Sequence, residues 1–124
     1  MNKEQIFDEA YDTYNKEIIH QREIQKEEVN RLRSQGNRVR VSLIELLSKE
    51  EFINKCKTDS EFSEKWGLKI EERELSLDER DDLFDKQYKS SDKKGLEYEI
   101  EINKNLPTKL ITITYNGETI ESYE

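Results

Sequence analysis

The sequence has few residues that cross-link or interrupt a chain: one cysteine, one proline and four glycines among 124 residues. A single cysteine cannot form an internal disulfide, which fits a reducing compartment. No apolar run approaches the roughly 18 residues of a membrane span, and the N-terminal residues show no signal peptide. We therefore expect a cytoplasmic protein. The abundance of Asn, Lys, Ile and Glu is typical of AT-rich bacterial or phage genomes, and a phage protein would act in the host cytoplasm.

The sequence also lacks the residue patterns typical of catalytic and nucleotide-binding sites. Its four glycines are isolated, which excludes a glycine-rich phosphate loop. His20 is the only histidine and Cys56 the only cysteine, and no third group is placed to orient them as a nucleophilic pair. We predict no catalytic residue, no cofactor and no metal site, and we expect that the protein is not an enzyme.

Charge is abundant, and acids outnumber bases by 29 to 21, for a net charge of −8. This balance argues against a protein that coats nucleic acid nonspecifically, because such binding draws on many cationic contacts to phosphate. Hydrophobic residues make up 32% of the chain and include six tyrosines and four phenylalanines. That is enough for a thin core covered by the stems of long charged side chains.

The basic side chains gather in residues 31–40, RLRSQGNRVR, which contain no acid. The arginines of this cluster are Arg31, Arg33, Arg38 and Arg40. Arginine binds carboxylates and phosphates in a bidentate manner, so the cluster is a candidate surface for an acidic protein or for nucleic acid. Two alternatives need no partner. Arg31 and Arg33 would offset the dipole of a helix that ends there, and the cluster would also pair with acids of the same chain.

The acidic side chains gather in residues 71–85, which carry eight acids and two arginines. Four aspartates recur at i, i+3, i+4 and i+7 and so share one face of a helix. No glycine-containing calcium loop surrounds them, so we expect this face to be solvated, or to mimic the spacing of phosphates and occupy the nucleic-acid groove of a partner protein. The candidate acidic surface consists of Glu71, Glu72, Glu74, Asp78, Asp81, Asp82 and Asp85.

Residues 3–34 predict one long helix, because they lack Gly and Pro and are rich in Glu, Lys, Gln and Arg. One apolar face is formed by Phe7, Tyr11, Tyr14 and Ile18. After Ile19 this stripe thins, which does not support a long coiled coil. We expect the first half to pack on the domain, and the second half to project or to form an interface. Gly36 suits a left-handed cap, and NRVRV after it predicts a short strand or an extended linker.

A cluster of short helices follows, predicted by pairs in which a hydroxyl precedes a glutamate by three residues. The pairs are Ser42–Glu45, Ser48–Glu51, Thr58–Glu61 and Ser76–Glu79. They predict helices at about 43–47, 49–57, 60–66 and 77–89, with Gly67 ending the third. The stretch TDSEFSEKWGL is similar to part of a helix-turn-helix. However, the segment after it has more acids than bases, which does not suit a phosphate-lined groove.

In the C-terminal residues the spacing of apolar side chains changes from the helical period to every second position. Apolar residues alternate with glutamates in residues 96–102, LEYEIEI, which predicts a strand with one buried face. Residues 109–115, KLITITY, predict a second strand, since they are rich in β-branched side chains. Asn116-Gly117 predicts a two-residue hairpin turn before a third strand at 118–124. This loop sets Ile113 opposite Ile120, Tyr115 opposite Glu118 and Leu110 opposite Tyr123.

The last strand also predicts a free sheet edge that can accept a partner strand, while Glu118, Glu121 and Glu124 discourage uncontrolled pairing. Together these patterns predict one α+β domain over residues 1–124. It has a helical part (1–89), a connector (90–95) and a three-stranded antiparallel β-meander (96–124). We expect a small, acidic, non-enzymatic protein-binding module, a bacterial or phage regulator or inhibitor that acts through its two charged surfaces. The alternatives are nucleic-acid binding through the arginines and a structural subunit that assembles with copies of itself.

Overall fold

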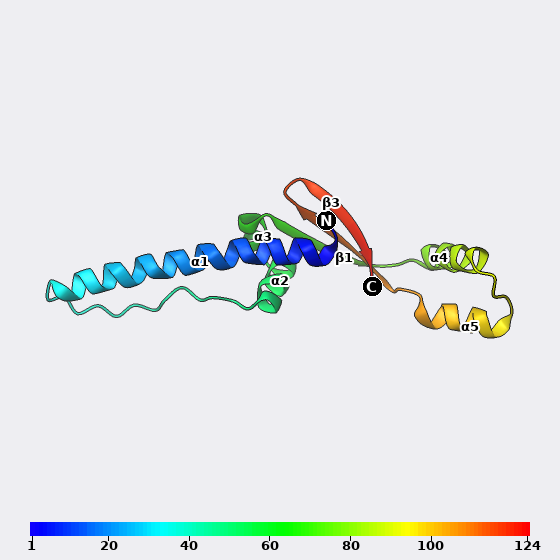
Figure 1. Cartoon of the computed structure of the whole chain (residues 1–124), viewed down its shortest axis with the longest axis horizontal. Helices are drawn as coiled ribbons and strands as arrows, with labels where there is room; N and C mark the ends of the chain where they lie inside the picture. Colours follow the sequence, from blue (N-terminus) through cyan, green and yellow to red (C-terminus); the bar gives the residue numbers. More distant parts are fainter. The chain divides into compact units, whose positions relative to one another are not determined.

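The computed structural model describes all residues from 1 to 124, and the chain divides into two compact units, Met1–Lys69 and Ile70–Glu124. The fold class is α+β, as the sequence predicts: a long N-terminal helix, several shorter helices and a C-terminal three-stranded antiparallel sheet (Figure 1). In chain order the elements are α1 (Lys3–Ser34), α2 (Lys49–Thr58), α3 (Ser60–Trp66), β1 (Leu68–Glu74), α4 (Leu77–Ser90), α5 (Leu96–Asn105), β2 (Lys109–Tyr115) and β3 (Glu118–Tyr123). The predicted connector, residues 90–95, lies inside the second unit, and the single-domain organisation stays a prediction.

Helix α1 has the predicted bounds, and both of its ends are capped. The Asn2 side chain accepts a 2.9 Å hydrogen bond from the Gln5 backbone, and the Gln5 side chain accepts one from the Asn2 backbone. This capping box has Asn and Gln where the predicted ones have a hydroxyl residue and Glu. At the other end Gly36 adopts a φ of +86°, and the Asn37 N–H donates to the Leu32 carbonyl at 3.1 Å, as in a left-handed C-terminal cap.

The core of the first unit is built on aromatic rings. The Tyr14 ring stacks on the Phe52 ring with centroids 4.6 Å apart and meets the Trp66 ring edge-on at 5.0 Å. Such pairs contribute about 0.5–1.5 kcal/mol beyond their buried area. The buried side chains of α1 and α2 are Ile6, Phe7, Ala10, Tyr14, Ile18, Phe52 and Cys56. The first half of α1 therefore packs on its own unit, as expected.

The helix predicted at 43–47 does not form, because side chains of α1 bind the backbone of this segment and take the Leu47 N–H, which such a helix would bond to the Leu43 carbonyl. The Ile44 N–H donates to the Gln25 side chain at 2.9 Å, and the Leu47 N–H donates to the Tyr14 hydroxyl at 3.1 Å. Residues 37–48 are therefore extended. The Ser42–Glu45 capping box is also wrong, whereas the boxes at Ser48 and Ser76 are confirmed.

Helix α3 has the predicted bounds, but a different residue caps it. The Asp59 side chain accepts from the backbone N–H groups of Glu61 and Phe62, both at 3.1 Å. Thr58 instead ends α2, where its hydroxyl donates to the Asn54 carbonyl at 3.1 Å. An aspartate one residue nearer the helix therefore takes the position predicted for the threonine.

The sheet has the order β1-β2-β3, and the hairpin of β2 and β3 has the predicted register. Ile113 lies opposite Ile120, Tyr115 opposite Glu118 and Leu110 opposite Tyr123. The third strand is β1 and not residues 96–102. Leu68 and Ile70 are buried on either side of exposed Lys69, so the start of β1 has the alternation of apolar and polar residues that is typical of a strand. The acidic segment that follows TDSEFSEKWGL, which would have to be the DNA-reading helix of a helix-turn-helix, is therefore largely a strand.

Residues 96–102 form most of helix α5 and not a strand, which corrects the prediction from their alternation. Residues with a spacing of two also fall at i and i+4, and so share a helix face. Tyr98 stacks on Tyr88 of α4 at 6.1 Å, and Ile102, four residues later, is buried. Glutamate is also a good helix former. No helix in the chain has the length and apolar character needed to cross a membrane.

Candidate binding surface

Helix α1 continues well beyond its packed half, and an extended segment runs back beside it (Figure 1). We call residues 37–48 the return segment, and residues 19–48 together the arm. No side chain of the arm is buried. Several apolar side chains are instead clearly exposed, among them Ile24 at 49%, Val41 at 44% and Leu43 at 39%. The arm therefore has no core of its own and presents apolar surface to its surroundings.

Hydrogen bonds from α1 hold the return segment in place. Besides the Gln25–Ile44 bond, the Tyr14 hydroxyl accepts from the Leu47 N–H, and the Tyr11 hydroxyl donates to the Leu47 carbonyl at 2.8 Å. Burial raises the pKa of the Tyr14 hydroxyl above its usual value, and the bond from the Leu47 N–H opposes this rise. The base of the return segment is therefore anchored through side chains and not through a β-ladder.

Further out, the backbone of the return segment has almost no partners within the chain. No backbone–backbone hydrogen bond involves residues 38–43. The Val39 carbonyl alone accepts a bond, from the Arg33 guanidinium at 3.1 Å. An extended backbone with unpaired N–H and C=O groups is a template for another strand.

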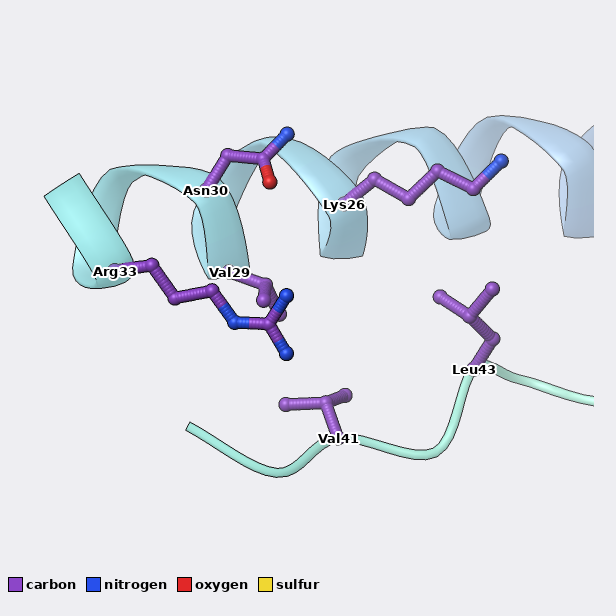
Figure 2. Close-up of a pocket in the computed structure, with 6 residues that line it drawn as sticks. All are labelled: Lys26, Val29, Asn30, Arg33, Val41 and Leu43. Carbon is purple, nitrogen blue, oxygen red and sulfur yellow. The ribbon is translucent and has the colours of Figure 1, made fainter. Parts of the chain in front are cut away.

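A groove of about 360 Å³ lies between the outer part of α1 and the return segment. Figure 2 shows Val41 and Leu43 pointing from the return segment toward α1, where Val29 faces them and the guanidinium of Arg33 reaches into the same space. Lys26 and Asn30 complete the lining. The groove combines apolar walls with cationic groups, which suits an apolar side chain next to a carboxylate.

All four arginines of the predicted basic cluster lie at the end of the arm, and all are exposed. Arg31 and Arg33 occupy the last turn of α1, where they offset the helix dipole, and Arg38 and Arg40 follow on the return segment. No acid occurs in residues 29–44, and none of the four arginines forms an ion pair. The structure therefore brings the predicted cluster together as one cationic tip.

The predicted acidic surface lies on two elements of the second unit. Three of its members are on β1, four are on α4, and all seven are exposed. The aspartates of α4 form no ion pair, and Asp78 lies in the first turn, where a carboxylate favours the helix dipole. No three carboxylate, thiol or imidazole groups of the chain are grouped as a metal site would require.

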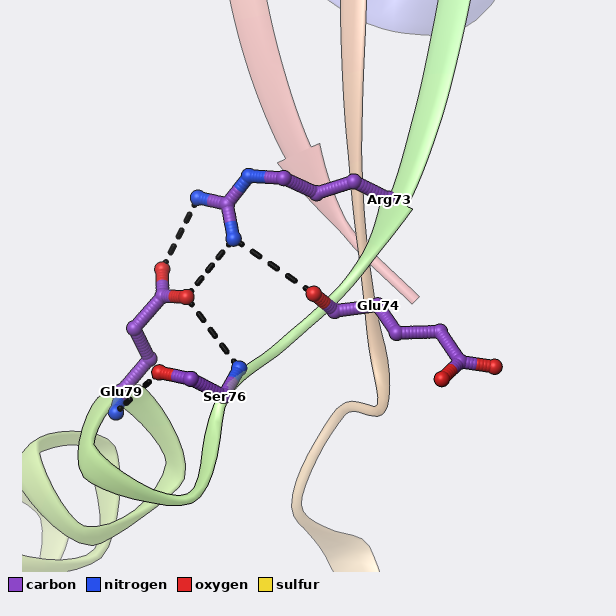
Figure 3. A network of polar contacts seen from close by, with 4 residues as sticks. All are labelled: Arg73, Glu74, Ser76 and Glu79. Atoms are coloured by element: carbon purple, nitrogen blue, oxygen red, sulfur yellow. Dashed lines mark hydrogen bonds and ion pairs between the residues drawn. The ribbon is translucent and has the colours of Figure 1, made fainter.

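An ion pair that sequence reasoning missed interrupts this surface. The Arg73 guanidinium donates to both carboxylate oxygens of Glu79, at 2.6 and 2.9 Å (Figure 3). Glu79 also accepts from the Ser76 N–H at 3.2 Å. The hydrogen bonds from Arg73, followed by those from Ser76, lower the pKa of Glu79 to about 2. The signal in the sequence was the capping box, which identified the Ser76 contact but not its arginine partner.

The remaining candidate groups do not form a reactive site. Cys56 is buried in the core of the first unit, and this burial raises the pKa of its thiol to about 12. A thiol with so high a pKa is almost never a thiolate near neutral pH, so it is a poor nucleophile. His20 is an exposed residue of the arm. No known protein family, curated protein or solved structure matches this chain.

Proposed function

We propose that this protein is a non-enzymatic binding module that contacts another protein through its arm, with the arginine tip as the centre of the contact. One observation supports this above the others. The arm exposes apolar side chains and four unpaired arginines over a stretch without a single buried residue. Arginine and apolar side chains together are typical of protein interfaces, and exposed apolar surface of this extent marks interaction sites.

The charged surfaces set the chemistry of the partner. The arginine tip suits a partner region rich in carboxylates, and the acidic surface on β1 and α4 suits a basic one. Charge complementarity of this kind raises association rates and excludes partners of the same sign. A small bacterial or phage regulator or inhibitor in the cytoplasm fits this description, in keeping with the expectation from composition.

Photo-crosslinking in bacterial cells that make the protein tests this proposal. A photoreactive residue replaces exposed Leu43 in the arm, and the control replaces exposed Glu64 of α3. We expect a protein adduct from position 43 and none from position 64. The adduct should disappear when Arg38 and Arg40 are changed to Glu. If position 43 captures no protein, or if both positions capture the same proteins, the arm is not a specific binding surface.

The unpaired arginines also support nucleic-acid binding as a second candidate. In this case the logarithm of the binding constant falls linearly with the logarithm of salt concentration. Changing Arg38 and Arg40 to Ala should reduce this slope by about 1–2, since roughly one counterion is released for each phosphate contact. Absence of nucleic-acid binding at low salt would exclude this candidate.

A further inference from the structure

The chain contains two unpaired extended edges of opposite charge. One is the backbone of residues 38–43, in which Arg38 and Arg40 alternate with Val39 and Val41. The other is the outer edge of β3, which is the last strand in the order β1-β2-β3. Each edge has free backbone groups, so each can accept an added strand.

The side chains of β3 complement those of the return segment. Glu118 and Glu121 are exposed and form no close ion pair within the chain, and the Glu121 carboxylate also interacts electrostatically with Arg73. Ile120 is half-buried opposite Ile113, which is fully buried. In β3, Glu118 and Ile120 lie on one face and Glu121 and Tyr123 on the other, so the edge is acidic on both faces, whereas the return segment has its arginines on one face and its valines on the other.

We propose that the return segment of one copy adds as a strand to the β3 edge of a second copy, with Arg40 beside the Glu121 carboxylate of that edge. This inference rests on the proposed function, since it names a second copy of this chain as the partner of the arm. Neither edge has to refold, because both are already extended. The contact is heterologous, so two copies either exchange strands in a closed pair or extend into a chain.

An antiparallel register that sets Val41 opposite Ile120 matches these two apolar residues on one face, where Leu43 lies opposite Glu118, and leaves the arginines on the other face. Val41 then extends the row of Ile113 and Ile120, which covers part of its exposed surface. On the other face Arg40 lies opposite Glu121. Arg38 lies opposite Tyr123, a residue that is 53% exposed and whose ring can receive a cation. Opposite charges across a strand pair stabilise it, and like charges destabilise it.

Light scattering on the full chain, across protein concentration and salt, tests the proposal. At low salt the mass should rise with concentration from 14.9 kDa toward a multiple of it. At about 1 M salt, where the screening length is only about 3 Å, it should return toward 14.9 kDa. A mass of 14.9 kDa under all conditions would overturn the proposal. The crosslinking experiment would still report on a foreign partner, so the two failures are distinguishable.

Reversing the charges of the return segment or of the β3 edge tests whether these two surfaces pair with each other. The double variants R38E/R40E and E118R/E121R should each be monomeric alone, because like charges then face each other across the contact. An equal mixture of the two should associate again, since each basic edge now meets an acidic one. A variant that fails to fold cannot give this rescue. Monomers in the mixture would contradict the proposed pairing.

Two further double variants separate this contact from general attraction between charges. E97R/E101R reverses two exposed acids of α5 and should leave the mass unchanged. D78R/D82R reverses two acids of α4. If D78R/D82R abolishes association while E118R/E121R preserves it, the arginine tip pairs with α4 and not with β3, and the proposal is wrong.

Discussion

Gln25 accepts a 2.9 Å hydrogen bond through its Oε1 from the backbone N–H of Ile44, and so joins the outer half of α1 to the return segment. This position is polar where a coiled-coil helix would carry an apolar residue. The side-chain amide of Gln25 therefore binds the return segment of its own chain and not a second helix. Few other bonds hold the arm in place, so the Gln25–Ile44 contact should control its order.

Replacing Gln25 with Ala should loosen the return segment without unfolding the first unit. A single hydrogen bond contributes about 0.5–1.5 kcal/mol, so protection of the Ile44 amide should fall roughly 2- to 10-fold. Native-state hydrogen exchange measures this directly. The matched control is Gln21→Ala, because Gln21 donates only to Glu17 within the same helix. Equal protection of Ile44 in both variants would mean that the Gln25 bond does not order the segment.

Replacing Phe52 with Ala should destabilise the first unit strongly. Phe52 is fully buried and contacts the rings of Tyr14, Tyr11 and Phe62. Loss of a buried phenylalanine costs about 3–5 kcal/mol, which denaturant unfolding followed by tryptophan fluorescence would measure, since Trp66 belongs to this cluster. The control Asn54→Ala changes an exposed residue of the same helix and should alter stability by about 0.5 kcal/mol or less. A loss below about 1 kcal/mol for Phe52→Ala would rule out this core.

The contribution of Glu79 should depend on pH in a defined direction. Its pKa is about 2 in the folded chain against a usual value of 4.5, so the folded state favours the ionised form. The stabilisation is therefore fully present above about pH 4.5 and is lost as the pH falls toward 2. Glu79→Gln should destabilise the second unit near pH 6, and its difference from the original protein should shrink toward pH 2. Thermal unfolding across this range gives the comparison.

Asp82→Asn provides the control for this titration, because Asp82 is exposed on the same helix and forms no ion pair. Its unfolding curve should follow that of the unmodified protein throughout. A difference between the Glu79→Gln variant and the unmodified protein that stays constant from pH 6 to pH 2 would show that Arg73 does not bind the ionised carboxylate.

Local patterns in the sequence predicted most of the elements. The bounds of α1, α3 and β2 follow from helix propensity, caps and β-branched residues, which act over a few neighbouring positions. The hairpin register follows from Asn116-Gly117, whose residues both adopt positive φ angles, of 51° and 79°. The sequence also located the arginine tip, because its members lie within ten residues of each other.

Two of the errors occurred where residues outside the segment decided the outcome. Residues 43–47 contain a capping signal, but Gln25 and Tyr14 take their backbone donors. Residues 96–102 alternate like a strand, yet Tyr88 gives their helical form a stacking partner. Short signals of this kind are compatible with two structures, and packing against another element selects between them.

The amino-acid sequence alone determined the long first helix, the hairpin register and the segregation of charge, because each depends on neighbouring residues. Only the tertiary structure decided that the backbone of residues 38–43 forms no hydrogen bond to another backbone group, that Val41 and Leu43 are exposed beside the arginines, and that Arg73 binds Glu79. These features depend on which distant side chains meet. A backbone donor, an apolar surface or a charge has no assigned partner until the chain has folded.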